Sequence, residues 1–402
     1  MERYDTMNNA CITQRVRLGV DVFLNAAHRK YKGARLGLIT NQCGQTSSLI
    51  PTVEALYHHK EVNLVALFGP EHGVRGDAQA GIRLANGVDP VTGLPVYSLY
   101  GDTRKPSAKA LEGIDALVFD IPDGGVRFLT YSSTLSYVME AAAEHGIKVI
   151  VCDRPNPIRG DRVEGNVLDP TFRSFVGCHP IAMRHGMTMG ELAWLMNEHF
   201  GIGCRLEVIR MEGWRREHWY DETGAFWVML GPNIPTLMAA TVYPGTCLVE
   251  GTNVSEGRGT TCPFELIGAP WIDAGRLCAA LRELSLPGLA LRQAHFTPTF
   301  SKYKGEGCHG VQIYVTDRDV FRPIGFALHL ISTIKRLFPQ DFQWRGKTEP
   351  LHFDLLWGTD IVRHRLDDGE SVDSILSSFQ PGIDRFLAVR ENYLLYPALE
   401  ND

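Results

Sequence analysis

The stretch of sequence that organises the chain reads Leu64-Val65-Ala66-Leu67-Phe68-Gly69-Pro70-Glu71-His72-Gly73-Val74-Arg75-Gly76. Its first five residues are apolar, which is typical of a buried strand, and the run stops at Gly69-Pro70. In an open α/β sheet, ligands bind in the loops at the carboxyl ends of strands, and glycines there let the backbone approach a ligand closely. A turn with solvated polar residues fits the same letters, so the rest of the chain has to distinguish a site from a turn.

Further apolar runs of strand length lie on both sides of this stretch. They cover residues 35–40, 94–98, 116–121, 148–152 and 206–211. Segments with helical signals separate several of them, at about 49–58, 133–145 and 189–200. Near-continuous apolar strands that alternate with helices are typical of a parallel, doubly wound sheet. The sequence therefore predicts an α/β fold.

The chain has 402 residues, which is more than one ordinary hydrophobic core accommodates. The proline-rich and glycine-rich region at 229–245 shows little periodicity, and we place a domain hinge there. We expect a flexible tail at 1–15, a first domain at 16–230 and a smaller α/β (α+β) domain at 231–402.

Composition excludes several classes of protein. The net charge of −6 argues against binding nucleic acid through bulk electrostatics, and no apolar run reaches the 18 residues that a membrane-spanning helix needs. The N-terminus has no apolar signal-peptide region. The nine cysteines are scattered without a CxxC pair, which fits reduced thiols. We therefore expect a cytoplasmic protein.

Polar side chains follow four of the expected strands. They are Asn41 and Gln42, Glu71 and His72, Asp120 with Asp123 and Arg127, and Asp153 with Arg154 and Asn156. Any one group could be a turn, because Asp and Asn side chains bond to local backbone. All four at one edge of a sheet favour a binding site.

Three other loops are rich in polar residues. The densest, at 249–261, carries Glu250, Asn253, Glu256 and Arg258 among three glycines. The other two contain Glu164, and Arg184 with His185. Thr188 and Glu191 follow directly, but their spacing is that of a helix capping box, so we interpret them as structural.

Several familiar chemistries lack their motif. The chain has no GxGxxG after its first strand, no GxxxxGK[ST] and no GxSxG, which disfavours nucleotide binding and serine hydrolysis. Carboxylates with asparagines and arginines suit a hydroxyl-rich ligand such as a sugar, whose glycosidic bond two carboxyl groups can hydrolyse. A metal-dependent hydrolase using His72, His179 or His185 with Asp120 or Asp153 stays open, as does a non-catalytic binder of sugars or cell-wall fragments.

Four motifs resemble the signatures of the exo-β-N-acetylmuramidase family. They are residues 68–73 (FGPEHG), 153–157 (DRPNP), 184–188 (RHGMT) and 250–260 (EGTNVSEGRGT). The resemblance implies a Rossmann-like domain, a smaller second domain and a cleft between them. It also implies an exo-acting glycosidase that releases N-acetylmuramic acid from the non-reducing end of peptidoglycan fragments. Many relatives carry export signals and this chain shows none, which suggests action on recycled muropeptide sugars.

The chain departs from the family pattern at two places. Residues 120–125 read DIPDGG where the family usually has DIQDVG, and 230–235 read LGPNIP where it has PSPNMP. Pro122 removes a backbone donor from an expected site loop. These changes leave the motif carboxylates in place and bear on sugar specificity.

The resemblance also suggests residue roles. Glu71 leads as the catalytic carboxyl, with Asp120 second and Glu250 and Glu256 third. Arg258, Arg127 or Arg154 would pair with the lactyl carboxylate of muramic acid, and asparagines at 41, 156 and 253 with sugar hydroxyls. The other expected substrate-binding residues are Gln42, His72, Arg75, Asp123, Asp153, Glu164, Arg184 and His185. We expect a small saccharide or muropeptide as substrate, and no metal or cofactor.

Overall fold

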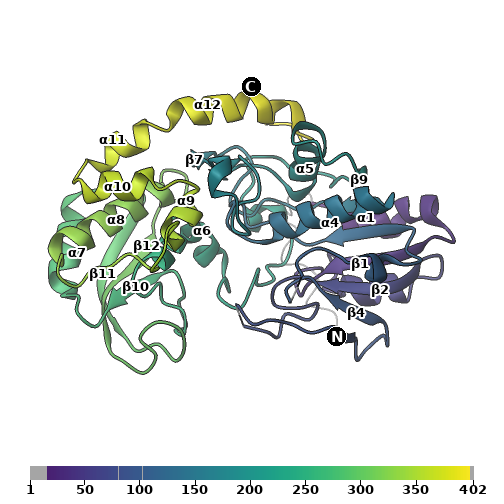
Figure 1. The fold of residues 1–402 in the computed structure, drawn as a ribbon, viewed down its shortest axis with the longest axis horizontal. Coiled ribbons are helices and arrows are strands. Elements are labelled where there is room, and N and C mark those ends of the chain that lie inside the picture. Colours follow the sequence, from purple (N-terminus) through teal and green to yellow (C-terminus); the bar gives the residue numbers. More distant parts are fainter. Residues whose placement is uncertain (1–15, 80, 102, 399–402) are drawn as a thin grey trace, which may run out of the picture.

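The computed structural model describes residues 16–398 except 80 and 102. The tail expected at 1–15 lies outside the described residues. The chain forms two lobes, each with its own sheet, and its last helices run across from one lobe to the other (Figure 1).

The first lobe is built on a seven-stranded sheet. Along the sheet, its strands are β3 (Gly87–Val88), β4 (Pro95–Ser98), β2 (Asn63–Gly69), β1 (Arg35–Thr40), β5 (Ala116–Asp120), β6 (Lys148–Cys152) and β9 (Arg205–Ile209). All of these pairs are parallel except β3 with β4. The parallel strands, numbered along the chain, follow the 3-2-1-4-5-6 order of the Rossmann fold. The expected α/β, doubly wound fold is confirmed.

Helices cover both faces of this sheet, as the near-continuous apolar strands require. One face packs against α1 (Gly19–Asn25), η1 (Ala27–Tyr31) and α2 (Thr52–Tyr57), and the other against α3 (Ala108–Leu111), α4 (Tyr131–His145) and α5 (Met189–Trp194). Gly146, at φ 65°, ends α4, which covers the helical segment expected at 133–145. The Thr188 and Glu191 capping box begins α5, which continues into a π-helical turn, η3 (Leu195–His199).

The second lobe is smaller. Its antiparallel sheet has the order β10 (Leu266–Ala269), β12 (Cys308–Val315), β11 (Leu289–Phe296). Around it lie α6 (Leu237–Thr246), η5 (Cys247–Gly251), α7 (Ala274–Glu283), α8 (Pro323–Leu337), α9 (His352–Trp357), α10 (Ile361–Asp367) and α11 (Val372–Ser377). Most of α6 lies within residues 229–245, where we expected a domain hinge with little periodicity, and the helix contains Pro244.

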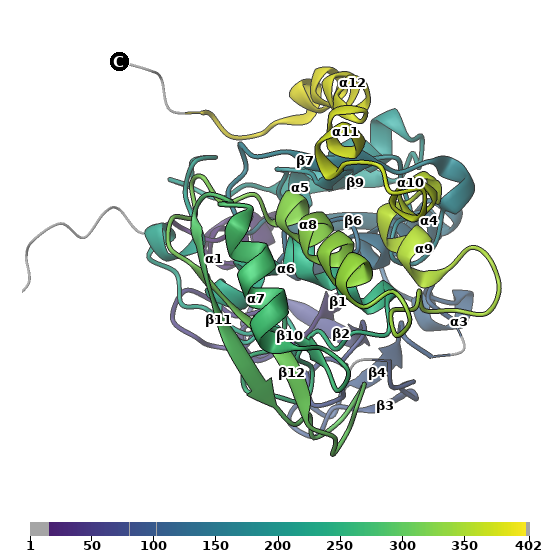
Figure 2. The same cartoon turned by 90° about the vertical axis from the view of Figure 1, so that its left-hand side faces the viewer.

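The chain then returns to the first lobe. Helix α12 (Gln380–Arg390) and η6 (Glu391–Tyr393) lie over α5 and β7 (Glu164–Val167), which pairs with β8 (Ala182–Arg184) (Figures 1 and 2). The Tyr396 hydroxyl donates to Asp153 at 2.6 Å. The domain division at residue 230 stays a prediction, and by packing residues 380–396 belong with the first lobe.

Two short 3₁₀ turns complete the first lobe, η2 (Pro170–Phe172) and η4 (Tyr220–Thr223). Between residues 16 and 398, leaving out 80 and 102, no helix is long and apolar enough to cross a membrane. The eight cysteines in the described part of the chain are free thiols.

Candidate functional site

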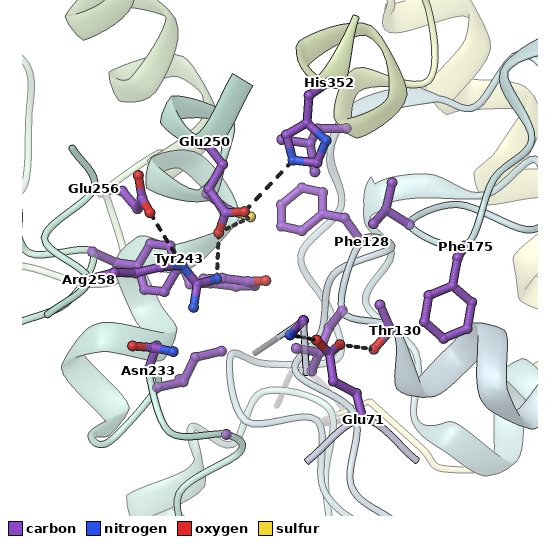
Figure 3. A pocket seen from close by; sticks show the side chains of 18 of the residues that line it. Glu71, Phe128, Thr130, Phe175, Asn233, Tyr243, Glu250, Glu256, Arg258 and His352 are labelled. Atoms are coloured by element: carbon purple, nitrogen blue, oxygen red, sulfur yellow. Dashed lines mark hydrogen bonds and ion pairs between the residues drawn. The ribbon is translucent and has the colours of Figure 1, made fainter. Parts of the chain in front are cut away.

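A cavity of about 750 Å³ lies between the two lobes. The loops that follow β2, β4 and β5 and residues 174–176 line it on one side, and residues within 230–264, 300–301 and 345–356 line it on the other. Its volume is in the range typical of small-molecule sites. Figure 3 shows carboxylates from both walls facing into it.

Glu71 lies on the first wall, two residues beyond the end of β2. Its Oε1 accepts a hydrogen bond from the Gly81 amide at 3.0 Å, and its Oε2 accepts one from the Thr130 hydroxyl at 3.1 Å (Figure 3). Burial and the neighbouring Glu71 carboxylate together raise the pKa of Tyr100 to about 12. The groups that hold Glu71 are thus uncharged donors, and no arginine or lysine forms an ion pair with Glu71 among the described residues.

His72 follows in a left-handed conformation, with φ 75°, which the tight turn after Pro70 imposes. Its Nδ1 lies 2.9 Å from the Ala78 carbonyl oxygen, so Nδ1 carries the proton and Nε2 is left as an acceptor. Burial lowers the pKa of His72, against the opposing effect of Glu71. His72 therefore presents a neutral imidazole to the cavity.

The second wall carries a network of opposite charges. Glu250 accepts a hydrogen bond from Arg258 at 2.6 Å, and its carboxylate lies 3.8 Å from the His352 Nε2 (Figure 3). The carboxylate of Glu256 lies 3.3 Å from Arg258 and 3.0 Å from the Lys302 Nζ. Burial alone would raise the pKa of Glu250, but Arg258 and His352 outweigh it, and the pKa of Glu250 is well below its usual range. Glu250 is therefore an ionised carboxylate.

Aromatic rings line the cavity where the two walls meet. Phe128 contacts Tyr243 edge to face, with ring centroids 5.5 Å apart, and Tyr243 contacts Phe264 in the same way at 4.7 Å. Beside them lies Asn233, which is 5% exposed and whose Nδ2 has no hydrogen-bond partner among the described residues. Apolar rings with a few placed polar groups suit the faces and hydroxyls of a sugar.

The structure places Asp120 outside this cavity, which corrects the expectation that it faces the ligand. Asp120 is fully buried and takes two hydrogen bonds from Arg154, at 2.6 and 2.9 Å. The physical reason is a cover over the sheet edge. The Met229 carbonyl accepts from Gln42 and Cys43, and the Leu230 carbonyl accepts from Tyr131, so this segment seals the crevice where Rossmann domains bind nucleotides.

Three more residues expected at the site are buried structural groups. Asp123 pairs with His185 at 2.9 Å, and both are at most 1% exposed. Asp153 accepts from Thr188, Gly190 and Tyr396, and burial raises its pKa to about 6.

The remaining expected residues also make internal contacts. The three asparagines bond to backbone: Asn41 accepts from the Cys43 amide, Asn156 donates to the Met187 carbonyl, and Asn253 bonds to residues 341 and 343. Two of the arginines form ion pairs, Arg184 with Glu164 and Arg75 with Glu54 and Asp89. Arg127 donates to four backbone carbonyls. None of them lines the cavity as the structure describes it. A residue type that suits a ligand also suits a buried network, and the sequence does not distinguish the two.

The cavity gathers five of the expected residues and several that the sequence reasoning missed. The expected ones are Glu71, His72, Glu250, Glu256 and Arg258. The missed polar ones include Tyr100, Arg104, Thr130, Ser174, Asn233, Arg345 and His352. Asn233 lies in a stretch already singled out by its resemblance, but Arg345 and His352 carry no local signal. Among the described residues, no three His, Cys, Asp or Glu side chains are arranged to hold a metal ion.

Comparison with known proteins adds to this geometry. Family models described as exo-beta-N-acetylmuramidase NamZ match the chain, the N-terminal model over residues 36–238 and the C-terminal model over 241–396. The chain is 48% identical over 392 residues to the peptidoglycan beta-N-acetylmuramidase NamZ of Bacillus subtilis (strain 168), an alignment that covers 98% of this chain and 94% of the relative.

Two solved structures, both of DUF1343 family proteins from Bacteroides fragilis NCTC 9343, share the architecture. One is 38% identical with a TM-score of 0.88 and covers 95% of this chain and 99% of its own. The other is 32% identical with a TM-score of 0.78 and covers 96% of this chain and 100% of its own. The two-lobed arrangement is therefore common to this chain and to proteins solved independently.

Proposed function

This chain belongs to the exo-beta-N-acetylmuramidase NamZ family, and we propose that it releases terminal N-acetylmuramic acid from the non-reducing end of peptidoglycan fragments, with Glu71 and Glu250 as its catalytic carboxyls. The observation that carries the residue assignment is the contrast between the two. Glu71 is held by uncharged donors, whereas Glu250 is paired with Arg258 and His352 on the facing wall.

Glu71 serves as the general acid. It donates its proton to the glycosidic oxygen as the bond from the anomeric carbon breaks, so that the leaving sugar departs as an alcohol. The oxygen of a water molecule bonds to the anomeric carbon, and a proton of that water returns to Glu71. A carboxyl beside a guanidinium would stay ionised and could not do this, which is why Glu71 suits the role and Glu250 does not. The neutral His72 next to Glu71 adds no positive charge that would hold the proton off.

Glu250 serves as the ionised partner. Positive charge develops on the anomeric carbon and ring oxygen in the transition state, and a fixed carboxylate on the opposite wall stabilises it. Arg258 and His352 hold Glu250 in place, and Lys302 pairs with the neighbouring Glu256. Asn233 and the rings of Phe128 and Tyr243 contact the sugar itself.

The test is hydrolysis of para-nitrophenyl β-N-acetylmuraminide, with the β-N-acetylglucosaminide as the comparison substrate. We expect the wild-type protein to release nitrophenol from the muraminide. Glu71→Gln should lower kcat by about 10²-fold or more, since it removes the transferable proton and keeps the shape. Glu283→Gln, an exposed change on α7, is the matched control and should match the wild type.

Two results would count against the proposal. Cleavage of the glucosaminide alone would retain a glycosidase but change the sugar. Full activity in Glu71→Gln would remove Glu71 from the chemistry. Circular dichroism of the variant, unchanged from the wild type, establishes that a loss of activity is not a loss of fold.

A further inference from the structure

Muramic acid differs from glucosamine by a lactyl ether that carries a carboxylate. A cationic side chain in the cavity is therefore the group that can recognise it. The sequence suggested Arg127, Arg154 or Arg258. Arg127 and Arg154 lie outside the cavity in buried networks. Arg258 lines the cavity, but its charge is already matched by Glu250 and Glu256.

Two other arginines line the cavity. Arg104 and Arg345 are both exposed, and neither forms an ion pair with a carboxylate that the structure describes. Arg345 lies on the second wall, where its Nη1 is 3.5 Å from the Glu250 carbonyl oxygen. Arg104 lies on the first wall, with Glu71.

Arg104 is held by aromatic rings. Its guanidinium carbon lies 3.9 Å from the centre of the Phe175 ring and 5.8 Å from that of Tyr100. Stacking fixes the plane of the guanidinium and leaves its edge, with its N–H donors, free to bind a carboxylate through two hydrogen bonds. Tyr100 also contacts Glu71, so the stacked arginine is one side chain away from the general acid.

A second donor lies on the same wall. Ser174 lines the cavity next to Phe175, and its buried hydroxyl has no hydrogen-bond partner within the described residues. A tight turn between Ser174 and Gly177 fixes its backbone, with reciprocal hydrogen bonds of 2.9 and 3.1 Å. The Ser174 hydroxyl is not bonded to Glu71, whose oxygens accept from Gly81 and Thr130.

From this juxtaposition we propose that Arg104, stacked on Phe175, and Ser174 bind the lactyl carboxylate of the terminal muramic acid. The first wall thereby determines which sugar the site accepts, while the second wall stabilises charge at the anomeric carbon. The inference rests on the proposed function and assigns its substrate preference to two named side chains.

The experiment compares kcat/KM for para-nitrophenyl β-N-acetylmuraminide with that for the same compound carrying a lactyl carboxamide. The wild type should prefer the carboxylate. Arg104→Gln should reduce that preference about 30- to 100-fold, and Ser174→Ala by roughly 3- to 10-fold, in line with hydrogen bonds to a charged group. Arg104→Lys keeps the charge without the fork and should fall between Arg104→Gln and the wild type.

Arg345→Gln is the matched control, because it removes the same charge from the opposite wall. Its preference for carboxylate over carboxamide should stay within about threefold of the wild type, whatever its absolute rate, since the change is remote from the carboxylate. An unchanged preference in Arg104→Gln, or a loss of preference in Arg345→Gln, would overturn the assignment.

Failure of the proposed function would look different. If the wild type hydrolyses neither compound, calorimetric titration with N-acetylmuramic acid and with N-acetylglucosamine tests the carboxylate site by itself. Weaker binding of N-acetylmuramic acid alone in Arg104→Gln would support the site. Equal binding by both proteins would overturn it.

Discussion

At the scale of single residues, the site works by giving two glutamates different neighbours. Glu250 and Glu71 are chemically identical, yet one lies against Arg258 and the other against a hydroxyl and a backbone amide. The environment assigns the roles, because a guanidinium holds a carboxylate in its ionised form more strongly than uncharged donors do.

This contrast predicts a change in pH dependence. In Arg258→Gln, burial of Glu250 is no longer opposed by the guanidinium, so the pKa of Glu250 rises. A carboxylate that must be ionised then becomes protonated at a higher pH. Because Glu250 titrates below the measured range in the wild type, we expect the kcat/KM profile on the muraminide to show an acid limb at higher pH in Arg258→Gln than in the wild type.

The profile should be measured from pH 3 to 8. Arg258→Lys retains a positive charge and should move the acid limb less than Arg258→Gln. An acid limb at the same pH in all three proteins would mean that Glu250 is not the group whose ionisation limits activity.

The sequence predicted part of the site at this scale. Glu71 and His72 were recognisable because an apolar run ends directly before them, and Glu250, Glu256 and Arg258 because their loop has little to bury. Asp120 and Arg154 matched the same criteria and lie elsewhere. Their ion pair depends on a cover formed by residues more than 70 positions away along the chain, and no local pattern reports that contact.

At the scale of elements, the return of the chain after α11 is the feature that joins the lobes. The Tyr396 hydroxyl donates to Asp153 and accepts from the Met211 amide, so the segment after α12 ends in the core of the first lobe. Arg390 at the end of α12 adds hydrogen bonds to the carbonyls of residues 160, 185 and 186.

Tyr396→Phe should therefore destabilise the protein in a pH-dependent way. The pKa of Asp153 is about 6 in the folded protein, above its unfolded value, so Asp153 is ionised in the fold only above about pH 6. The Tyr396 hydroxyl stabilises the ionised form. Its loss should cost about 1.5–3 kcal/mol at pH 8 and less at pH 5, where Asp153 is protonated.

Urea unfolding of Tyr396→Phe and the wild type at both pH values measures this difference. Tyr393→Phe, a nearby change in η6, serves as the comparison. An equal loss at pH 5 and pH 8 would show that the hydroxyl acts through packing or the Met211 amide and not through the charge of Asp153.

The elements themselves were predictable where one local rule dominates. The strands of the first sheet, the cap at Gly146 and the capping box of α5 follow from apolar runs and terminal residues. Helix α6 and strand β11 did not follow. Pro244 lies inside α6, and β11 alternates poorly between buried and exposed positions, so tertiary packing decides both.

At the scale of the whole molecule, the two lobes form the walls of one cavity and must hold a fixed relation to each other. Arg127, which is 1% exposed, provides a direct link. Arg127 belongs to the first lobe, where it donates to the carbonyls of Asn166 and Ile181. It also donates to the carbonyls of Leu356 and Trp357 in the second lobe. Burial lowers its pKa to about 9, which still leaves it charged at pH 7.

Arg127→Met should uncouple the lobes. The substitution keeps much of the side-chain volume but leaves four buried carbonyls without their donor, at a cost on the order of 3–5 kcal/mol. Because two of those carbonyls belong to each lobe, the lobes lose a shared interaction, and unfolding should become less cooperative.

Hydrogen exchange at increasing urea concentrations, read separately for peptides from β5 and β6 and from β12 and α8, measures the unfolding midpoint of each lobe. We expect one midpoint for the wild type and for Arg336→Met, an exposed change on α8, and two for Arg127→Met. A single midpoint that simply moves to lower urea would mean that α12 alone couples the lobes and that Arg127 contributes stability only.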